Sequence, residues 1–497
     1  MMFYLDDYDS TNVDSIFNYS KQLIDKTFKE IIEIDVSSQS VLRDENDLEN
    51  SEIALRNKGN LGQIIEKYFF HYECNSDSRA DFPDAGVELK VTPFEYKKNG
   101  DIRAGERLVL SNISYDNEMS ETLYESHLWE KCKLLLLVYY FRDRGLDDKL
   151  KYKIKYVYLF TPDEVDLAII KNDYEVISRK VIEGKAEELS ESLTFYLGAC
   201  TKGATADSSW SRQFYPPYSL AKKRAFCYKN SYMTIVLKKY IVPNVVERET
   251  IVKNIIELRE KTFAELVIEK IKRYRGKLDW ELCKIFDCKY GDRKALWSEL
   301  VYRMLGIKSN KAEEFQKANV VVKVIRLEEN DKIRESMSFP TFTYKGIIQE
   351  TWETSKLNEY FEMTKFLFVV FKRKRDHYYL KGATFWNMPY SDLNTEVKEG
   401  WEKVVDTIKN GVKLTVSENK NGKKIVKNNL PKKSDNKIVH VRPHTARSYH
   451  EFNDGTIISD GGSRSNANQL LDGTWMTNHC FWLNNDYILK QIEPLLK

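Results

Sequence analysis

The apolar positions near the start of the chain recur with the period of an amphipathic helix. Residues 11–33 predict one long helix, and Ser10, Thr11 or Asn12 could cap its first turn. Residues 60–70 predict a second helix, with its apolar side chains on one face. After these segments the helical pattern gives way to strand-like runs, so the first helices are expected to cover a sheet.

Apolar residues next gather in short runs bounded by turn residues, a pattern typical of strands. Helical spacing returns over residues 173–192 and again over 244–278, which we interpret as a connection between two halves. Residues 418–437 are polar and rich in Lys, Asn and Gly, and they predict a surface loop. The mixture indicates a mixed α/β fold with a central sheet. The strand-like runs are 86–94, 106–115, 133–141 and 152–160.

Four segments of the first half recur, in the same order, in the second half. Such a series predicts a duplicated domain. We therefore expect a domain at 1–240, a helical linker at 241–284 and a second copy at 285–497. The paired segments are 57–69 with 293–305, 106–115 with 335–344, 125–140 with 357–372 and 162–184 with 389–411.

Composition narrows the function less than the pattern does. The net charge of +3 is the balance of 78 basic and 75 acidic residues, so it neither favours nor excludes a nucleic-acid partner. Seven scattered cysteines form no C-x-x-C pair, so neither a disulfide framework nor a zinc knuckle is indicated. The longest apolar run, Leu134–Phe141, is too short to cross a membrane. The N-terminus has no signal-peptide pattern, and a reducing cytoplasmic setting is expected.

One stretch, "DFPDAGVELKVTPF" at 81–94, places charges among apolar residues. Side chains alternate along a strand, so Glu88 and Lys90 share one face and the apolar residues between them enter the core. Asp81 or Asp84 would join them from the preceding turn. Two carboxylates and an ammonium group would then meet at one end of the sheet.

This pattern has two readings. Carboxylates suit Mg²⁺, which can polarise a phosphodiester and activate a water molecule, while a lysine can orient that water. Glu-x-Lys on one strand face is also common as a solvated charge pair, and the preceding Pro-Asp-Ala-Gly can be only a turn. Spacing alone leaves both readings open.

The stretch resembles the motif of the MutH family of GATC-directed DNA endonucleases, in which an Asp precedes Glu-x-Lys by seven residues within a D-F-P…G-V-E-L-K frame. "KGNLGQIIEKYF" upstream and "ESHLWEKCKLLLLV", "DYEVISRKVIEG" and "YLGACTKGATADS" downstream resemble further segments of that family in the same order. A doubled chain with a degenerate second copy is similar to the Sau-three-A-one branch of the family. The resemblance implies a restriction-endonuclease-like fold of the PD-(D/E)xK type, present twice.

The resemblance also implies roles for single residues. Mg²⁺ would be held by Asp81, Glu88 and the carbonyl of Leu89, Lys90 would position the attacking water, and Asp84 would have no role. Glu130 stands where MutH has a histidine. The catalytic residues implied are Asp81, Glu88, Lys90, Glu66, Lys58 and Lys131.

Contacts with bases are implied at three positions. Lys202 matches a lysine of the family's base-reading loop, whereas Cys200 replaces an arginine of that loop. In the second copy, "HVRPHTARS" has Arg442 at the place of Cys200, followed by His444. Arginine is the usual bidentate partner of guanine. Lys202, Arg442 and His444 are therefore expected to contact DNA.

The resemblance implies a Mg²⁺-dependent type II restriction endonuclease that cuts both strands of duplex DNA at or beside GATC, with a DNA-induced dimer possible. The alternatives are a mismatch-repair enzyme that nicks one strand and a non-catalytic DNA-binding or scaffold protein. The second copy is expected to be catalytically silent and to bind a second GATC as an effector. Carried across the repeat, the active-site positions Glu66, Glu88, Lys90 and Lys131 become Tyr302, Val321, Lys323 and Met363.

Overall fold

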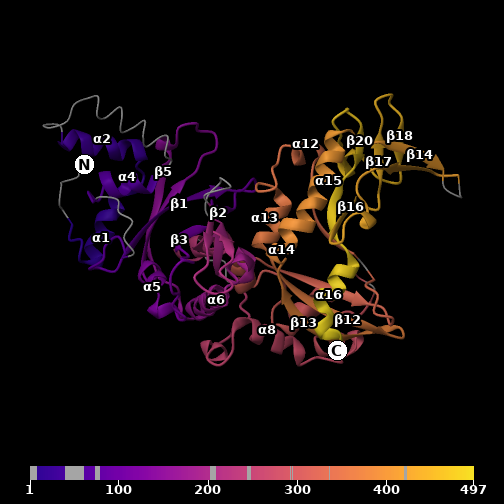
Figure 1. Ribbon diagram of the computed structural model, residues 1–497, viewed down its shortest axis with the longest axis horizontal. Helices are drawn as coiled ribbons and strands as arrows, with labels where there is room; N and C mark the ends of the chain where they lie inside the picture. Colours follow the sequence, from indigo (N-terminus) through magenta and orange to yellow (C-terminus); the bar gives the residue numbers. More distant parts are fainter. Residues whose placement is uncertain are drawn as a thin grey trace. The chain divides into compact units, whose positions relative to one another are not determined.

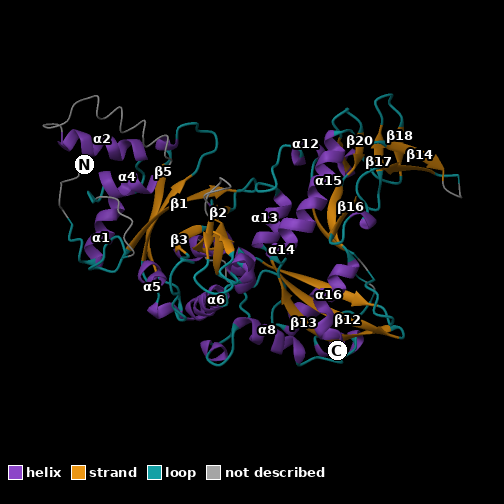
Figure 2. Ribbon diagram, viewed as in Figure 1, coloured by secondary structure: helices purple, strands orange, loops and turns teal. Residues whose placement is uncertain are grey.

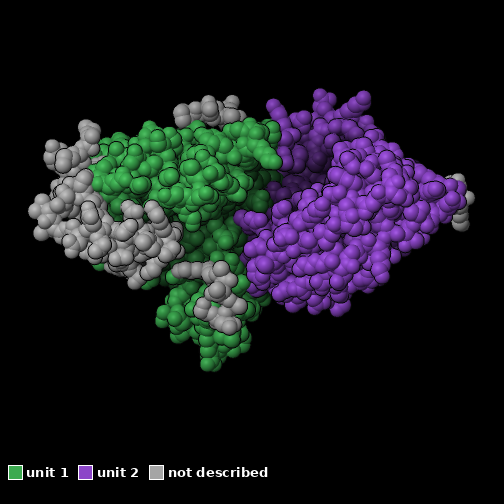
Figure 3. Space-filling model, turned by 90° about the horizontal axis from the view of Figure 1, so that it is seen from above, with its two compact units in different colours: residues 1–262, 311–319 green, residues 263–310, 320–497 purple. Residues whose placement is uncertain are grey.

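The computed structural model of the protein describes residues 8–39, 61–72, 79–201, 209–242, 248–291, 293, 295–334, 336–418 and 422–497. Its backbone separates into two compact units (Figures 1 and 3). Unit 1 contains residues 1–262 and 311–319, and unit 2 contains residues 263–310 and 320–497. None of the described helices is long and apolar enough to cross a membrane.

The start of the chain forms two α-helices where the pattern predicted one. Helix α1 spans Val13–Ser20 and helix α2 spans Phe28–Gln39. The side chain of Asn12 caps α1 by accepting a hydrogen bond from the Ser15 amide. Between the helices Asp25 has a φ of 67°, a backbone conformation that cannot continue a right-handed helix. The prediction of one continuous helix was therefore wrong.

The main sheet of unit 1 has the strand order β2-β1-β4-β5. Strand β1 runs parallel to β4, and β4 is antiparallel to β5. Helices α1, α2 and α4 pack on one face of this sheet and enclose an aromatic-rich core (Figures 1 and 2). The elements are α4 Leu61–Tyr68, β1 Glu88–Tyr96, β2 Ile102–Ala104, β4 Leu135–Phe141 and β5 Lys153–Phe160.

A second sheet in unit 1 has the order β3-β9-β6, and a short ribbon pairs β7 with β8. Helix α6 begins before the predicted range of 173–192 and ends ten residues earlier, at Ile182. Helix α11 belongs to this unit because Lys317 forms a buried ion pair with Asp166 of α6 at 2.6 Å. The elements are β3 Leu108–Asn112, α5 His127–Cys132, α6 Glu164–Ile182, β6 Leu197–Thr201, β7 Trp210–Arg212, β8 Leu220–Lys222, β9 Arg224–Tyr228, α7 Asn230–Val236 and α11 Glu313–Ala318.

Unit 2 contains sheets of the same two kinds, ordered β10-β12-β13 and β11-β21-β16. It adds a β14-β15 ribbon and a four-stranded sheet of order β18-β17-β20-β19. Its helices are α8 Phe263–Lys272, α9 Asp279–Ile285, α10 Leu296–Met304, α12 Tyr344–Ile347, α13 Lys356–Met363, α14 Tyr390–Asp392, α15 Lys398–Lys409 and α16 Asn485–Leu496. Its strands are β10 Val320–Leu327, β11 Met337–Thr341, β12 Lys365–Lys374, β13 His377–Trp386, β14 Leu414–Glu418, β15 Lys424–Asn428, β16 Val439–Pro443, β17 Tyr449–Glu451, β18 Ile457–Ser459, β19 Ala467–Gln469, β20 Trp475–Thr477 and β21 His479–Leu483.

The two units repeat one fold down to its irregularities. In unit 1 the β4-β5 register shifts between Tyr139 and Tyr140, and in unit 2 the β12-β13 register shifts between Val370 and Phe371. In both units a strand parallel to the shifted strand precedes it in the chain. The duplication predicted from the sequence agrees with this repetition.

Two other predictions were wrong. Residues 244–278 do not form a continuous helical connection: only η8, Ile255–Leu258, and α8 are helical in its described part, and residues 248–254 are extended or irregular. The stretch 418–437 is not only a loop, because Lys424–Asn428 pairs with Leu414–Glu418 as an antiparallel ribbon.

Candidate active site

The site is built on the turn that precedes β1. Phe82 and Val87 exchange two backbone hydrogen bonds, of 2.9 and 3.2 Å, which close the turn. Gly86 has a φ of +66°, and a Cβ there would lie 3.1 Å from Cε of Lys133. The turn therefore needs the freedom of glycine. Its closure brings Asp81 beside the first residue of β1.

Asp81 and Glu88 meet at the start of β1. The Asp81 carboxylate accepts a hydrogen bond of 2.9 Å from the Leu89 amide, and the Asp81 amide donates one of 3.3 Å to Glu88 Oε2. Nζ of Lys90 lies 2.7 Å from Glu88 Oε1. The predicted Asp, Glu and Lys are therefore in contact.

Lys131 joins this group from another element. Its Nζ lies 3.5 Å from Glu88 Oε1. It stands in the last turn of α5, whose first turn is capped by the Ser126 hydroxyl. Parallel pairing of β1 with β4 places Glu88 opposite Leu135, three residues after this helix ends. The short α5-β4 connection thus positions Lys131.

The electrostatics of Asp81 show how crowded the carboxylates are. Burial raises the pKa of Asp81 to about 6, and the negative charges of Glu88 and Glu66 act in the same direction. Lys90 and the Leu89 amide oppose the shift. Glu66, on α4, thus lies near enough for its charge to act on Asp81, and its catalytic role stays a prediction.

The alternative interpretation, that Glu88 and Lys90 form only a solvated charge pair, does not fit this geometry. The exposed fraction of Glu88 is only 2%. β2 pairs with β1 only from Phe94 to Tyr96, so β4 is the one strand paired with the Glu88 end of β1 in the described part of the chain. A buried carboxylate is costly unless cations or hydrogen bonds compensate it, and two lysines supply that compensation here.

The residues present fit a single Mg²⁺ ion. Burial and the charge of Glu88 raise the pKa of Asp81, and a divalent cation beside the two carboxylates would relieve their mutual repulsion. The described residues contain no group of three or more His, Cys, Asp and Glu side chains suited to a metal. Mg²⁺ needs only one or two carboxylates because it keeps several waters. Asp81, Glu88 and the Leu89 carbonyl would hold it.

Two predicted residues, and the alternative candidate Asp84, fall outside this group. Lys58 and Lys202 lie outside the described residues. Asp84 is exposed on the turn, away from the contacts of Asp81. Spacing alone had left Asp81 and Asp84 as equal candidates, and the hydrogen bond from the Leu89 amide distinguishes them.

Strand pairing tests whether the active-site positions of unit 1 were assigned to the correct residues of unit 2. Glu88 pairs with Leu135, four residues before the shift at Tyr139, and Val321 pairs with Phe366, four residues before the shift at Val370. Val321 therefore holds the position of Glu88, as predicted, and Lys323 that of Lys90.

The assignment of Met363 to Lys131 was wrong by one residue. Helix α5 ends at Cys132 and α13 ends at Met363, each seven residues before its register shift. Glu362 therefore occupies the Lys131 position.

An acidic residue also precedes Val321 at the spacing of Asp81 from Glu88, but it belongs to unit 1 and makes other contacts. Glu314 stands seven residues before Val321, the spacing of Asp81 from Glu88. Its carboxylate accepts hydrogen bonds from the amides of Ile251 and Val252, at 2.9–3.0 Å. No pair of carboxylates like that of Asp81 and Glu88 forms at Val321 in the described part of unit 2.

The predicted base-reading residues of unit 2 lie at the end of β16. Tyr228 pairs with Leu197, and Leu483 pairs with Val439. This register puts Arg442 at the place of Cys200. Its guanidinium carbon lies 4.6 Å from the centre of the Trp482 ring.

Arg442 and its neighbour differ in exposure from the matching residue of unit 1. Arg442 and His444 are exposed, whereas Cys200 is buried. Nδ1 of His444 lies 3.4 Å from Sγ of Cys480. Only the unit 2 position is therefore accessible to a DNA base.

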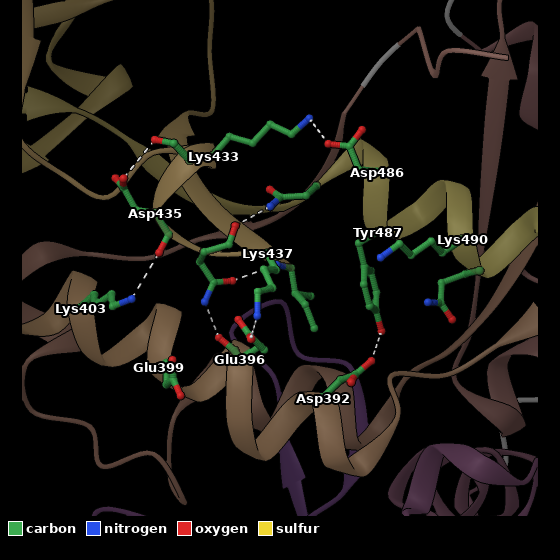
Figure 4. Close-up of a pocket in the computed structure, with 15 residues that line it drawn as sticks. Asp392, Glu396, Glu399, Lys403, Lys433, Asp435, Lys437, Asp486, Tyr487 and Lys490 are labelled. Atoms are coloured by element: carbon green, nitrogen blue, oxygen red, sulfur yellow. Dashed lines mark hydrogen bonds and ion pairs between the residues drawn. The ribbon is translucent and has the colours of Figure 1, made fainter.

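A cavity of about 820 Å³ in unit 2 is lined mainly by charged and polar side chains (Figure 4). Two ion pairs join charged residues of its lining: Lys433 with Asp486 at 2.8 Å, and Lys437 with Glu396 at 3.1 Å. Asn436, in its wall, accepts from the Val439 amide and so fixes the start of β16. We interpret the cavity as part of the support for β16.

Comparisons with known proteins agree with this geometry. The family model described as "DNA mismatch repair enzyme MutH" matches residues 70–173, the segment that contains the Asp81, Glu88, Lys90 and Lys131 cluster. The chain is 35% identical to the type II restriction enzyme Sau3AI of Staphylococcus aureus over 504 aligned positions, which cover 96% of this chain and 99% of that enzyme. It is 28% identical to the DNA mismatch repair protein MutH of Buchnera aphidicola over 148 positions, 28% of this chain and 62% of that protein. The chain therefore belongs to the family of Sau3AI and MutH, and it is a site-specific deoxyribonuclease with a restriction-endonuclease-like fold.

Proposed function

We propose that the enzyme is a type II restriction endonuclease that hydrolyses both strands of duplex DNA at GATC with Mg²⁺. The observation that carries the proposal is the contact set around Glu88: Asp81 through its amide, and Lys90 and Lys131 through their ammonium groups. The overall similarity to Sau3AI supports the same reading. GATC itself comes from the resemblance to the MutH family.

Each residue has a task in this proposal. When bound, Mg²⁺ would polarise the scissile phosphate and lower the pKa of a water molecule. Asp81 and Glu88 would hold it with the Leu89 carbonyl. Lys90 would orient the attacking water, and its ion pair of 2.7 Å with Glu88 keeps its ammonium group at the site. Lys131, 3.5 Å from Glu88, would stabilise negative charge on the phosphate.

The second copy would bind DNA without cutting it. Val321 supplies no carboxylate where Glu88 stands, so Mg²⁺ would have too few ligands there. Arg442 remains exposed at the end of β16 and suits a guanine. We propose that this copy binds a second GATC as an effector of the N-terminal copy.

Two alternatives to this proposal predict different products in a cleavage experiment. A mismatch-repair nuclease of the MutH kind would cut one strand, and a non-catalytic DNA-binding protein would cut neither. The doubled chain argues against the first, because the match to MutH covers only 28% of this chain. The buried Asp81, Glu88 and Lys90 cluster argues against the second. Digestion of a plasmid with one GATC site, followed by separation of nicked from linear product, distinguishes all three.

A further inference from the structure

The segment that leads into the base-reading strand differs between the units. In unit 1, 14 residues separate the end of α6 at Ile182 from the start of β6 at Leu197. In unit 2, 29 residues separate the end of α15 at Lys409 from the start of β16 at Val439. The additional residues form the β14-β15 ribbon, which unit 1 lacks at this place.

The ribbon adds little to the core of unit 2. None of the residues in its two strands is buried, and Val416 is 45% exposed. Its root is nevertheless fixed, because Leu430 is buried and the Lys413 amide donates to Asn429 Oδ1 at 2.8 Å. An exposed ribbon on a fixed root suggests a binding role.

The ribbon and its flanks carry strong positive charge. Residues 410–438 contain eight lysines and two acidic residues. Lys413, Lys424 and Lys427 are exposed, and no carboxylate of the described residues forms an ion pair with any of them. Unpaired cations on an exposed strand pair attract a polyanion.

The root of the ribbon lies next to the predicted base-reading residues. Nδ2 of Asn428, the last residue of β15, lies 3.3 Å from Nε2 of His479. His479 pairs with Pro443 across the β16-β21 ladder, and Arg442 pairs with the next residue, Cys480. One end of the ribbon is therefore held beside the Arg442 position.

We propose that the β14-β15 ribbon is a DNA-binding arm that contacts the phosphates flanking the sequence bound by Arg442. The inference rests on the proposed binding of duplex DNA by the C-terminal copy. A two-stranded ribbon fits a DNA groove. Five residues of strand extend about 17 Å, which corresponds to about five base pairs. Lys424 and Lys427 would thus lie over DNA outside the recognition sequence.

Fluorescence titrations of the full chain with labelled duplexes in EDTA test the arm. One duplex has a central GATC with long flanks, and the other is truncated to eight base pairs. The Lys424→Ala/Lys427→Ala variant is compared with Lys398→Ala/Lys409→Ala, which removes the same charge from α15 of the same unit. Circular dichroism and thermal melting establish that each variant folds.

For the long duplex, the logarithm of the observed overall association constant is plotted against the logarithm of the salt concentration. The ribbon variant is expected to reduce the slope by about 1.8, because each lost phosphate contact removes about 0.9. Its affinity at low salt should fall on the order of tenfold. The control pair should change neither value, and Lys→Arg at both ribbon positions should restore them.

The outcomes separate this inference from the proposed function. If the ribbon variant keeps the slope and affinity of a wild type whose binding depends steeply on salt, the ribbon does not bind DNA, and the proposed nuclease function is unaffected. A ribbon that binds a protein partner would give this result. An equal loss on the truncated duplex also overturns the inference, because the contacts would then not lie on the flanks. A wild type that binds neither duplex refutes the proposed function itself.

Discussion

Val321 holds in unit 2 the strand position that Glu88 holds in unit 1, each paired with a residue four positions before a register shift in the neighbouring strand. One copy of the fold thus presents a buried carboxylate at this position, and the other presents an apolar side chain. The first prediction concerns that carboxylate. Glu88→Gln or Asp81→Ala should lower the cleavage rate by about 10²- to 10³-fold, the scale for losing one electrostatic group from an active site.

Binding should survive these substitutions, because Asp81 and Glu88 are proposed to hold a metal and not a base. Gel-shift titration with a GATC duplex measures it beside the cleavage rate. Asp84→Ala is the matched control, since Asp84 is an exposed carboxylate of the same turn. If Asp84→Ala abolished cleavage and Asp81→Ala did not, the assignment of the metal ligands would be incorrect.

The lysines around Glu88 give a second prediction. Lys131→Ala should reduce cleavage about tenfold to hundredfold, because its ammonium group lies at the site and a lost or misplaced group there raises the barrier. Lys133→Ala should have little effect, since Lys133 pairs with Glu130 at 3.0 Å. Single-turnover cleavage of a short duplex compares the two. Equal loss in both variants would indicate a general effect of charge on DNA binding.

The effector role of the C-terminal copy gives a third prediction. A plasmid with two GATC sites should be cut roughly 5- to 150-fold faster than a plasmid with one, the usual range of coupling between sites. Arg442→Ala should remove the difference while leaving the basal rate on one site intact. Added GATC oligonucleotide should accelerate cleavage of the one-site plasmid. Equal rates on both plasmids, unaffected by the substitution or the oligonucleotide, would exclude an effector site.

A fourth prediction concerns pH and the stability of unit 2. Burial lowers the pKa of His479 to about 4, and charge on His450 acts in the same direction. The unfolded chain takes up this proton near pH 6.5, so the stabilisation is complete above that pH and is lost as pH falls toward 4. The loss should reach about 3 kcal/mol.

Thermal melting between pH 7.5 and 4.5 measures this effect. His479→Asn should flatten the fall in melting temperature over that window, and His444→Asn, at an exposed position, should not. An unchanged pH profile in the His479 variant would show that another group controls acid unfolding.

Much of the fold followed from the sequence. The repeated segment at β3 and β11 aligns in the structure as it does in the sequence: Leu108 and Met337 pair with the equivalent residues Tyr228 and Leu483. The segment at β4 and β12 was misplaced by one residue. Both strands are apolar on both faces, so a shift of one position leaves the hydrophobic pattern intact.

The errors in secondary structure have similar causes. The break between α1 and α2 falls at Asp25, which has a positive φ although no glycine or proline in the sequence marks a turn there. The β14-β15 ribbon buries neither face, so it has no alternating apolar pattern to reveal it. At the site, strand spacing indicated Glu88 and Lys90 but left Asp81 and Asp84 open, and the family resemblance selected Asp81. Only the folded turn shows that the Leu89 amide donates a hydrogen bond to the Asp81 carboxylate.

Digestion of two duplexes that differ only in containing GATC or GTAC bears most directly on the proposed function. With Mg²⁺, the wild type should cut both strands of the GATC duplex, leave the GTAC duplex intact and become inactive in EDTA, while Glu88→Gln should bind the GATC duplex without cutting it. Cleavage of both duplexes, cleavage in EDTA, nicking of one strand only, or full activity of Glu88→Gln would contradict it.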